Sequence, residues 1–177
     1  IINTVATEAA DPVPRLRDLA AVGADYATTG PNHNTVRRPI RSSADTLFRR
    51  LEDGPANKEW QGIAVEWAAE PPFGVGPTRT IRGLGQTIEQ RVLAWEPGRR
   101  MCFRNDRATL PLASFAEDYI ITPTGSASCE LSWHFAYEWA GPAKRVLGRL
   151  FGTAFAIGAR QDLRRLARMI QYADSGS

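Results

Sequence analysis

The stretch "PPFGVGPTRTIRGLG", residues 71–85, decides between two fold classes. Its glycines would suit a loop that binds phosphate, but such a loop leads into a helix whose N–H groups point at the phosphate. Here the next residues, "QTIEQRVLAW" (86–95), alternate along the chain and are rich in Thr, Ile and Val. This alternation predicts a strand. We therefore interpret the glycines as two turns in an antiparallel sheet, which argues against a nucleotide-binding fold.

The same alternation recurs on both sides of the glycines. Strands are predicted in "TVRRPI" (35–40), "IAVEWAA" (63–69), "TIEQRVLAWEPGRR" (87–100), "RMCFRN" (100–105) and "SFAEDYIITP" (114–123). In the third of these, alternation places Trp95 on the face opposite Val92. The clearest strand is "CELSWHFAYEW" (129–139), where six apolar residues share one face: Cys129, Leu131, Trp133, Phe135, Tyr137 and Trp139. That face must be buried, because exposing each large side chain would cost about 1.5–3 kcal/mol.

Three helical segments accompany these strands. "SSADTLFRRLED" (42–53) predicts a short helix that Ser43 caps, and "GPANKEW" (54–60) predicts a break with one further turn. A long helix is expected from Pro142 to about Tyr172, with Leu150, Phe151 and Phe155 facing the sheet. "DPVPRLRDLAAVGADYA" (11–27) predicts another short helix, followed by the linker "TTGPNHN" (28–34). We expect residues 1–32 to form an N-terminal extension and residues 33–173 to form one α+β domain.

Composition excludes several classes of protein. The chain has 177 residues, a net charge of +3 and 43% hydrophobic residues, as in an ordinary globular domain. Its two cysteines, Cys102 and Cys129, are expected to be reduced and buried. No apolar run reaches the length of about 18 residues that a membrane span needs, so a cytoplasmic location is expected. No metal-ligand spacing occurs among the His, Cys and carboxylate residues, and we expect no metal and no cofactor.

Basic residues concentrate in the last helix. Residues 142–170 carry seven Lys and Arg against one acid, Asp162. Such a charge run usually forms a solvated helix face, and no nucleic-acid-binding motif accompanies it, so binding to nucleic acid is not expected. Transient contact with an anionic membrane stays open.

Five segments together resemble the START-like, or SRPBCC, superfamily and, within it, the polyketide cyclase/dehydrase branch. They are "SSADTLFRRLEDG…EW" (42–60), "GVGPTRTIRGLG" (74–85), "VLAWEPGRRMCFR" (92–104), "CELSWHFAYE" (129–138) and "GRLFGTAFAIGARQDLRRLARM" (148–169). The resemblance implies a helix-grip (START/Bet-v-1-like) fold, in which a curved antiparallel sheet of about 6–7 strands surrounds a long C-terminal helix. It also implies an apolar cavity between the two. Members bind lipids, sterols, quinones, hormones or polyketides, and a minority catalyse cyclisation or dehydration.

Candidate site residues are those that this arrangement turns toward the cavity. A ligand is expected to contact Trp67, Gln90, Phe103, Glu117, Tyr119, Trp133, Phe135, Tyr137, Leu150, Phe151 and Phe155. If the protein is an enzyme, Glu117 and Tyr119 are the best catalytic candidates, because a cyclase needs an acid or base beside an enolisable carbonyl. Arg79 and Arg91 would either contact the ligand or pair with Glu89 or Glu117.

Three functions stay open at this point. The first is binding of a small hydrophobic, lipid-like or aromatic ligand by a carrier or sensor that is a monomer or homodimer. The second is a cofactor-free polyketide cyclase or dehydratase, and the third is a ligand-free interaction domain. Glycines at 148, 152 and 158 of the long helix either allow close packing or leave room for a ligand. The N-terminal extension could cover the mouth of the cavity.

Overall fold

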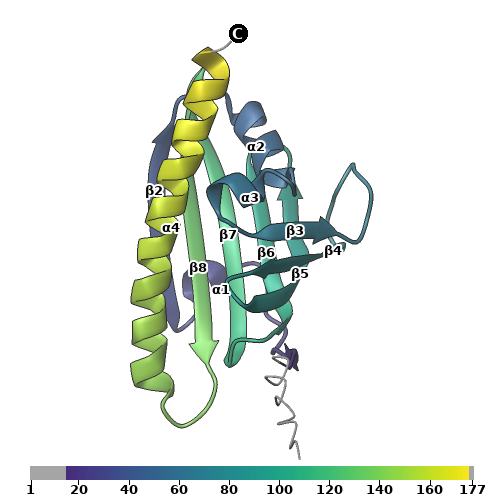
Figure 1. Ribbon diagram of the computed structural model, residues 1–177, viewed down its shortest axis with the longest axis vertical. Helices are drawn as coiled ribbons and strands as arrows, with labels where there is room; N and C mark the ends of the chain where they lie inside the picture. The colour runs from purple at the N-terminus through teal and green to yellow at the C-terminus, as the bar shows by residue number, and fades with distance from the viewer. Residues whose placement is uncertain (1–14, 176–177) are drawn as a thin grey trace, which may run out of the picture.

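The chain folds into one curved antiparallel sheet that wraps along a long C-terminal helix (Figure 1). This computed structural model describes residues 15–175 and, in the last helix, the side chains of residues 146–172. The strands are β1 (Arg17–Asp18), β2 (Asn32–Ile40), β3 (Ala64–Trp67), β4 (Thr78–Gly83), β5 (Gln86–Glu96), β6 (Arg100–Ala108), β7 (Leu112–Gly125) and β8 (Ser128–Trp139). The helices are α1 (Tyr26–Thr29), α2 (Ala44–Glu52), α3 (Asn57–Trp60) and α4 (Lys144–Ser175).

The sheet order confirms the expected α+β architecture. Strands follow one another as β2-β8-β7-β6-β5-β4-β3, and β1 pairs with β6 outside this path. Every pair is antiparallel. β2 and β3 therefore form the two edges, and the chain between them supplies α2 and α3. These two helices and α4 lie on the same side of the sheet (Figure 1).

The glycine-rich stretch forms turns, as predicted. Residues 68–77 connect β3 to β4, and a two-residue turn joins β4 to β5. In this turn Leu84 has a φ of 51° and Gly85 a φ of 71°. Two positive φ values in succession match the right-handed twist of the flanking strands, which is why such turns favour glycine. No helix follows the glycines, so a phosphate loop is excluded.

The N-terminal segment differs from its prediction. The predicted helix over residues 11–27 lies partly outside the described residues, and residues 15–25 are not helical. Instead, Arg17 and Asp18 pair with Ala108 and Arg107, and only one helical turn follows at α1. β2 begins at Asn32, inside the predicted linker. Sheet pairing at an available position beside β6 outweighs the weak helical propensity of this segment.

This segment also lies away from the expected cavity mouth. Arg100 donates a 3.4 Å hydrogen bond to the Ala24 carbonyl, and Tyr26 and Ser114 share one of 2.6 Å. Both sheet residues belong to the face that points away from α4. The described part of the extension therefore covers the outer face of the sheet.

A bulge in β5 overturns the predicted position of Trp95. The register shifts between Val92 and Ala94, so that Val92 pairs with Phe103 and Trp95 with Met101. An extra residue in a strand reverses the alternation beyond it. Trp95 consequently lies on the inner face, where its ring is 5.2 Å from Phe48 and 6.4 Å from Phe103.

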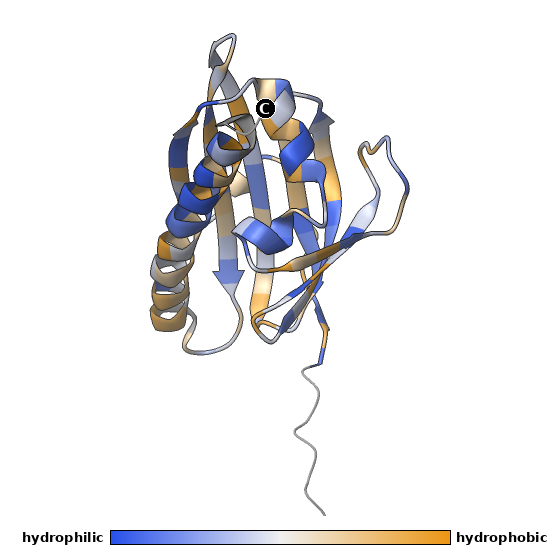
Figure 2. Cartoon of the chain, turned by 45° about the horizontal axis from the view of Figure 1, so that its top comes forward, coloured by the Kyte–Doolittle hydropathy of each residue, from blue (hydrophilic) through white to orange (hydrophobic). Residues whose placement is uncertain are grey.

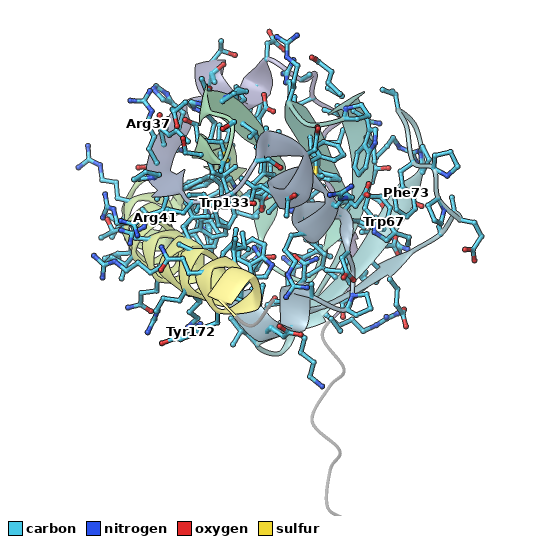
Figure 3. The ribbon with its side chains drawn as sticks, turned by 90° about the horizontal axis from the view of Figure 1, so that it is seen from above. Arg37, Arg41, Trp67, Phe73, Trp133 and Tyr172 are labelled. Atoms are coloured by element: carbon cyan, nitrogen blue, oxygen red, sulfur yellow. The ribbon has the colours of Figure 1, made fainter. Side chains whose placement is uncertain are left out.

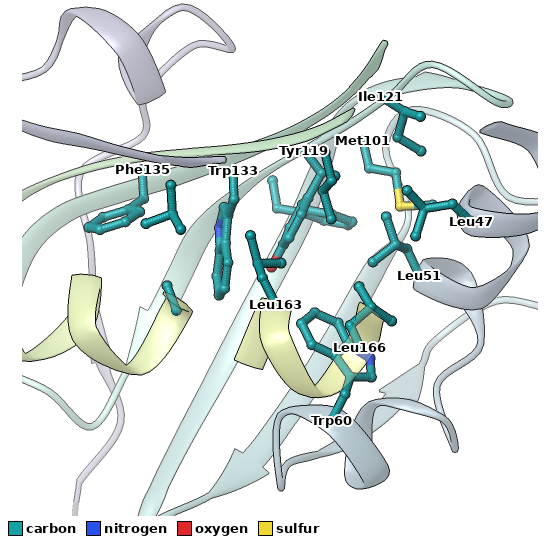
Figure 4. Packing of buried hydrophobic residues seen from close by; sticks show 14 of the residues in the cluster. Leu47, Leu51, Trp60, Met101, Tyr119, Ile121, Trp133, Phe135, Leu163 and Leu166 are labelled. Atoms are coloured by element: carbon teal, nitrogen blue, oxygen red, sulfur yellow. The ribbon is translucent and has the colours of Figure 1, made fainter. Parts of the chain in front are cut away.

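Buried apolar residues of the sheet and the helices form the core, part of which is shown in Figure 4. Ser43 caps α2 by accepting a hydrogen bond from the Thr46 N–H, as predicted. The apolar stripe of α2 then packs its leucines toward Met101 and Ile121, and Trp60 of α3 lies beside Leu166 (Figure 4). The aromatic face of β8 is buried along most of its length, and both cysteines are buried and reduced, as expected.

The buried stripe of α4 corrects the placement of Leu150. Leu150 is 63% exposed, although it was expected to face the sheet. The stripe instead runs through Gly148, Gly152, Ala156, Ala159, Leu163, Leu166 and Ile170. Small residues carry its first half, so a search for large apolar side chains picks the wrong helix face there. In Figure 2 the N-terminal part of α4 is largely orange, because apolar residues lie on its exposed face as well as on its buried face.

Candidate functional site

A cavity of about 340 Å³ lies between α4 and the strands β4–β7. Its wall is mostly aliphatic and aromatic, with Ile81, Ile88, Leu110, Leu112, Phe115, Trp133, Phe151 and Phe155 among the lining residues. Leu84, on the exposed β4–β5 turn, also borders it and is 89% exposed. The cavity therefore reaches from the buried face of the sheet to the surface at this hairpin.

Six of the eleven predicted ligand contacts line the cavity. They are Gln90, Glu117, Tyr119, Trp133, Phe151 and Phe155. Four others lie behind the wall. Phe135 packs 4.5 Å from Phe155, and Tyr137 packs 4.9 Å from Phe151. Trp67 and Phe103 contact Arg79 from the side away from the cavity, and Leu150 lies on the solvent side of α4.

A buried polar cluster closes the inner end of the cavity. Its centre is the carboxylate of Glu117, which is 4% exposed. One oxygen accepts from Gln90 Nε2 at 2.8 Å and from Arg79 Nη2 at 3.5 Å. The other accepts from Tyr119 Oη at 3.2 Å and from Trp133 Nε1 at 3.0 Å. Four donors in this arrangement hold the carboxylate in a single orientation.

The guanidinium of Arg79 is held on three sides. Its Nε donates to Gln90 Oε1 at 2.9 Å. Its Cζ lies 3.6 Å from the centroid of Phe103 and 5.4 Å from that of Trp67, which makes two cation–π contacts. Gln90 in turn donates to Asn105 Oδ1 at 3.0 Å. Arg79 is thus a fixed charge, positioned by strands β3, β5 and β6.

Burial sets the protonation of this cluster. Desolvation lowers the pKa of Arg79, and the negative charge of Glu117 opposes that shift. An arginine pKa starts so high that the side chain still carries its charge. Burial, followed by the charge of Glu117, raises the pKa of Tyr119 well above 10, so its hydroxyl stays protonated and donates to Glu117. The inner end therefore holds one positive and one negative charge.

A third charged group lines the cavity from α4. Burial raises the pKa of Asp162 from 3.8 to about 6, and nearby Arg165, 3.4 Å away, partly offsets the shift. Asp162 is ionised at neutral pH, and Arg165 balances it. The lining as a whole carries no excess of positive charge.

The helix glycines divide into two kinds. A Cβ at position 152 would collide with the hydroxyl of Tyr137, which donates to the Gly148 carbonyl. Gly148 and Gly152 therefore serve close packing against β8. A Cβ at Gly158 would meet nothing within 4 Å, and Gly158 lines the cavity. Here the missing side chain leaves open volume.

Several lining residues were missed from the sequence, chiefly Gln61, Asn105 and Asp162. Asn105 could have been found from the sequence. It lies an even number of residues from Met101 and Phe103 in the same strand, so it is a polar residue on their buried face. Gln61 and Asp162 carried none. Of the two arginines considered, Arg79 pairs with Glu117 and Arg91 pairs with Asp106. Within the described residues, no three His, Cys, Asp or Glu side chains converge to hold a metal ion.

His134 belongs to the other face of the sheet. Its Nδ1 shares a 2.8 Å hydrogen bond with Thr35 Oγ1, and burial lowers its pKa. It is a structural histidine and does not border the cavity. No helix in the described part of the chain is long and apolar enough to cross a membrane.

The chain is similar in sequence to one group of known proteins and similar in fold to several solved structures. An uncharacterized protein of Mycobacterium tuberculosis, Rv2574, is 34% identical over 160 residues, which cover 87% of this chain and 92% of that protein. The crystal structure of TTHA0849 from Thermus thermophilus superposes with a TM-score of 0.66 at 15% identity, over 80% of this chain and 98% of that one.

A second solved structure is the di-domain aromatase/cyclase (ARO/CYC) BexL from the BE-7585A biosynthetic pathway. It superposes with a TM-score of 0.62 at 15% identity, and the match covers 78% of this chain and 46% of BexL. Both structural likenesses concern the fold alone. Residues 33–171 match the family model described as "Polyketide cyclase / dehydrase and lipid transport". Because this match covers most of the 177 residues, the chain belongs to the polyketide cyclase/dehydrase and lipid transport family.

Proposed function

We propose that this protein binds a small, neutral and largely apolar molecule in the cavity beneath α4, as a carrier or sensor. The observation that carries the proposal is the cavity itself, with its volume of about 340 Å³ and its mainly apolar wall. Sites for small molecules are concave, mostly apolar and equipped with a few polar groups. Protein interiors otherwise pack closely, so a hollow of this size needs a reason.

The polar groups at the inner end favour a neutral ligand. Arg79 and Glu117 cancel each other at 3.5 Å, and Arg165 balances Asp162. An anionic head group would lose its hydration in the cavity without gaining a free positive charge. A hydroxyl or carbonyl group needs only a hydrogen bond, and Arg79, Asn105 and Tyr119 border the space where it would lie. An aryl ketone or a phenol fits this description.

A pair of fluorescent probes tests the proposal. N-phenyl-1-naphthylamine is neutral, whereas 1-anilinonaphthalene-8-sulfonate has a similar ring system and one negative charge. We expect saturable binding of the neutral probe and at least about tenfold weaker binding of the anionic one, a difference of about 1.4 kcal/mol. Equal affinity for both probes, or no saturable binding of either, would contradict the proposal, and the second result would favour a ligand-free interaction domain.

Two variants of α4 locate the bound probe. Gly158→Leu fills open volume at the cavity wall, and Thr153→Leu adds the same side chain on the exposed face of the same helix. We expect Gly158→Leu to abolish binding of N-phenyl-1-naphthylamine and Thr153→Leu to leave it unchanged. Equal effects would place the probe outside the cavity.

A second candidate function is cofactor-free cyclisation or dehydration. The contact of Tyr119 Oη with Glu117 at 3.2 Å on the cavity wall favours it, since both groups can take part in proton transfer. The test is α-hydrogen exchange of acetophenone in D₂O, followed by NMR. Catalysis predicts faster exchange that Glu117→Gln removes while probe binding persists. If the exchange is no faster with the protein than in buffer alone, the result argues against catalysis, and the binding proposal is unaffected.

A further inference from the structure

A second recess lies on the other side of α4, between that helix and the edge strand β2. Its volume is about 180 Å³, and it is lined by Thr35, Val36, Arg37 and Arg38 of β2 and by Arg160, Leu163 and Arg164 of α4. It shares no lining residue with the cavity described above. Inferences about this recess therefore stand apart from the proposed function.

The base of the recess is apolar and its walls are cationic. Val36 is 4% exposed and Leu163 is fully buried, whereas all four arginines are exposed. Arg160 and Arg164 are four residues apart on α4 and thus share one helix face. Arg38 approaches from β2 on the face that carries Val36, whereas Arg37 lies on the opposite face, near His134. No strand within residues 15–175 pairs with the outer edge of β2. The recess is therefore open along one side, with guanidinium groups on both walls.

These four charges have no counter-charge in the described part of the chain. No lining residue is acidic, and no ion pair joins any of the four arginines to a carboxylate there. Some arginines elsewhere do pair with a carboxylate, as Arg100 shows with three hydrogen bonds to Asp118. Arg38, Arg160 and Arg164 place three like charges around one small recess, so the folded state retains an arrangement that a bound anion would stabilise.

Further basic residues extend the same surface. Arg41 follows β2 directly, and Figure 3 shows it beside α4, whereas Arg37 lies on the other side of β2. Arg168 lies one turn beyond Arg164 and is exposed. In Figure 2 the C-terminal half of α4, which carries these arginines, contains blue, hydrophilic segments. An approaching anion therefore meets a positive field before it reaches the recess.

From this geometry we propose that the recess between β2 and α4 binds a phosphate group. A phosphate offers several acceptor oxygens, and the planar fork of a guanidinium can bond two of them at once. Groups on opposite walls can thus bind one phosphate together, with Arg38 on one side and Arg160 and Arg164 on the other. The phosphate belongs either to a soluble phosphate ester or to the head group of a membrane lipid.

Two matched double variants test the site. Arg38→Gln/Arg164→Gln removes two charges from the recess, one from each wall. Arg99→Gln/Arg149→Gln removes two exposed charges elsewhere, so the net charge of the two proteins is equal. Inorganic phosphate is titrated in low-salt chloride buffer by calorimetry and thermal unfolding. We expect phosphate to raise the Tm of the wild type and of the control, and to bind the recess variant about tenfold more weakly or worse.

The unfolding temperature without phosphate supplies an independent readout. The recess variant should be as stable as the wild type or slightly more stable, because two repelling charges are gone. A purely structural role for these arginines predicts the opposite. Equal weakening of phosphate binding in both double variants would overturn the proposal, since a diffuse basic surface would then suffice. No phosphate binding by the wild type would also overturn it.

Vesicles distinguish the two sources of phosphate. Phosphatidylcholine vesicles with and without 20% phosphatidic acid are sedimented with each protein. Co-sedimentation that needs phosphatidic acid and is lost in Arg38→Gln/Arg164→Gln assigns a lipid head group. Binding of inorganic phosphate without co-sedimentation assigns a soluble phosphate ester. Either result supports the site, whereas vesicle binding that both double variants lose equally contradicts it.

Discussion

The two ends of the space between sheet and helices contain similar side chains but are filled differently. At one end, Leu163 and Leu166 of α4 are fully buried among residues from α2, α3 and the sheet (Figure 4). At the other end, Phe151 and Phe155 of the same helix are only partly buried and border the cavity. The difference follows from which elements cover each end. α2 and α3 complete the first, and the β4–β5 hairpin borders the cavity at the second.

We expect the filled end to contribute most to stability, and we propose that the hollow end binds the ligand. The filled end holds the sheet and helices together, because close packing gives each apolar side chain many contacts. The hollow end gives up such contacts, and its polar groups sit where a ligand would end. Arg79 and Glu117 lie at the border between the two ends. We therefore expect a substitution that breaks this pair to lower the stability more than the other substitutions below.

The largest effect is expected at this border. Glu117→Ala leaves the buried charge of Arg79 without its partner, and we expect a loss of about 3–5 kcal/mol in the free energy of unfolding. Urea denaturation followed by circular dichroism measures it. The double variant Arg79→Met/Glu117→Leu should be more stable than Glu117→Ala, since no unpaired charge remains. If Glu117→Ala alone were harmless, the ion pair would not be buried as described.

Truncation of an apolar side chain tests the contrast directly. Leu163→Ala removes a fully buried side chain at the filled end and should cost about 2–5 kcal/mol. Ile88→Ala at the cavity wall should cost less, about 1 kcal/mol, because that side chain is already exposed to the hollow on one side. The same denaturation experiment compares them. Equal losses would mean that the cavity end is packed as well as the core.

Two glycines of α4 provide a finer test. Gly152→Ala forces a methyl group against Tyr137 and should destabilise the protein by about 1–3 kcal/mol. In Gly158→Ala the added methyl group meets open space. This variant should be more stable by up to about 1 kcal/mol, because alanine has a higher helix propensity than glycine. Thermal unfolding of the two variants gives opposite signs in this account. A loss of stability in Gly158→Ala would show that the cavity wall is already filled there.

Asp162 should produce the smallest effect and a pH dependence. Its folded pKa of about 6 lies above the unfolded value of 3.8, so the folded state disfavours the ionised form. Its contribution to stability therefore falls as the pH rises from 4 to 7. Solvent reaches about 20% of the side chain, so we reduce the expected gain in Asp162→Asn to about 1 kcal/mol at pH 7.

The pH profile of the difference between Asp162→Asn and the wild type checks this sign. The variant should be more stable at pH 7 and equal to the wild type at pH 3.5. A gain that stayed constant from pH 3.5 to 7 would mean that the ionisation of Asp162 is not involved. Because the other groups titrate in both proteins, their contributions cancel in the difference.

Strand alternation carried most of the fold prediction. In β8 the apolar residues at 129–139 recur without interruption, so the buried face could be assigned from the sequence alone. The bulge at Leu93 could not be foreseen, because no glycine or proline marks it, and Trp95 was placed on the wrong face. Leu150 was misplaced for a related reason. Close contact between α4 and the sheet requires Gly and Ala, which a search for large apolar residues overlooks.

The candidate site was only partly predictable. The carboxylate Glu117 could be found because it interrupts an apolar face between Phe115 and Tyr119. Which side chains line the cavity depends on the depth at which the helix lies over the sheet. The sequence does not encode that depth in any local pattern, so Phe135 and Tyr137 were expected to touch a ligand and lie one layer behind the wall.

A crystal structure of the protein soaked with N-phenyl-1-naphthylamine tests the central claim most directly. Our account predicts the probe between Ile88 and Phe155, beneath α4, with its N–H directed toward Tyr119 Oη as the acceptor. The account would be contradicted by a structure in which Phe151 and Phe155 turn inward and fill the interior, and the probe binds only on the outer surface of α4.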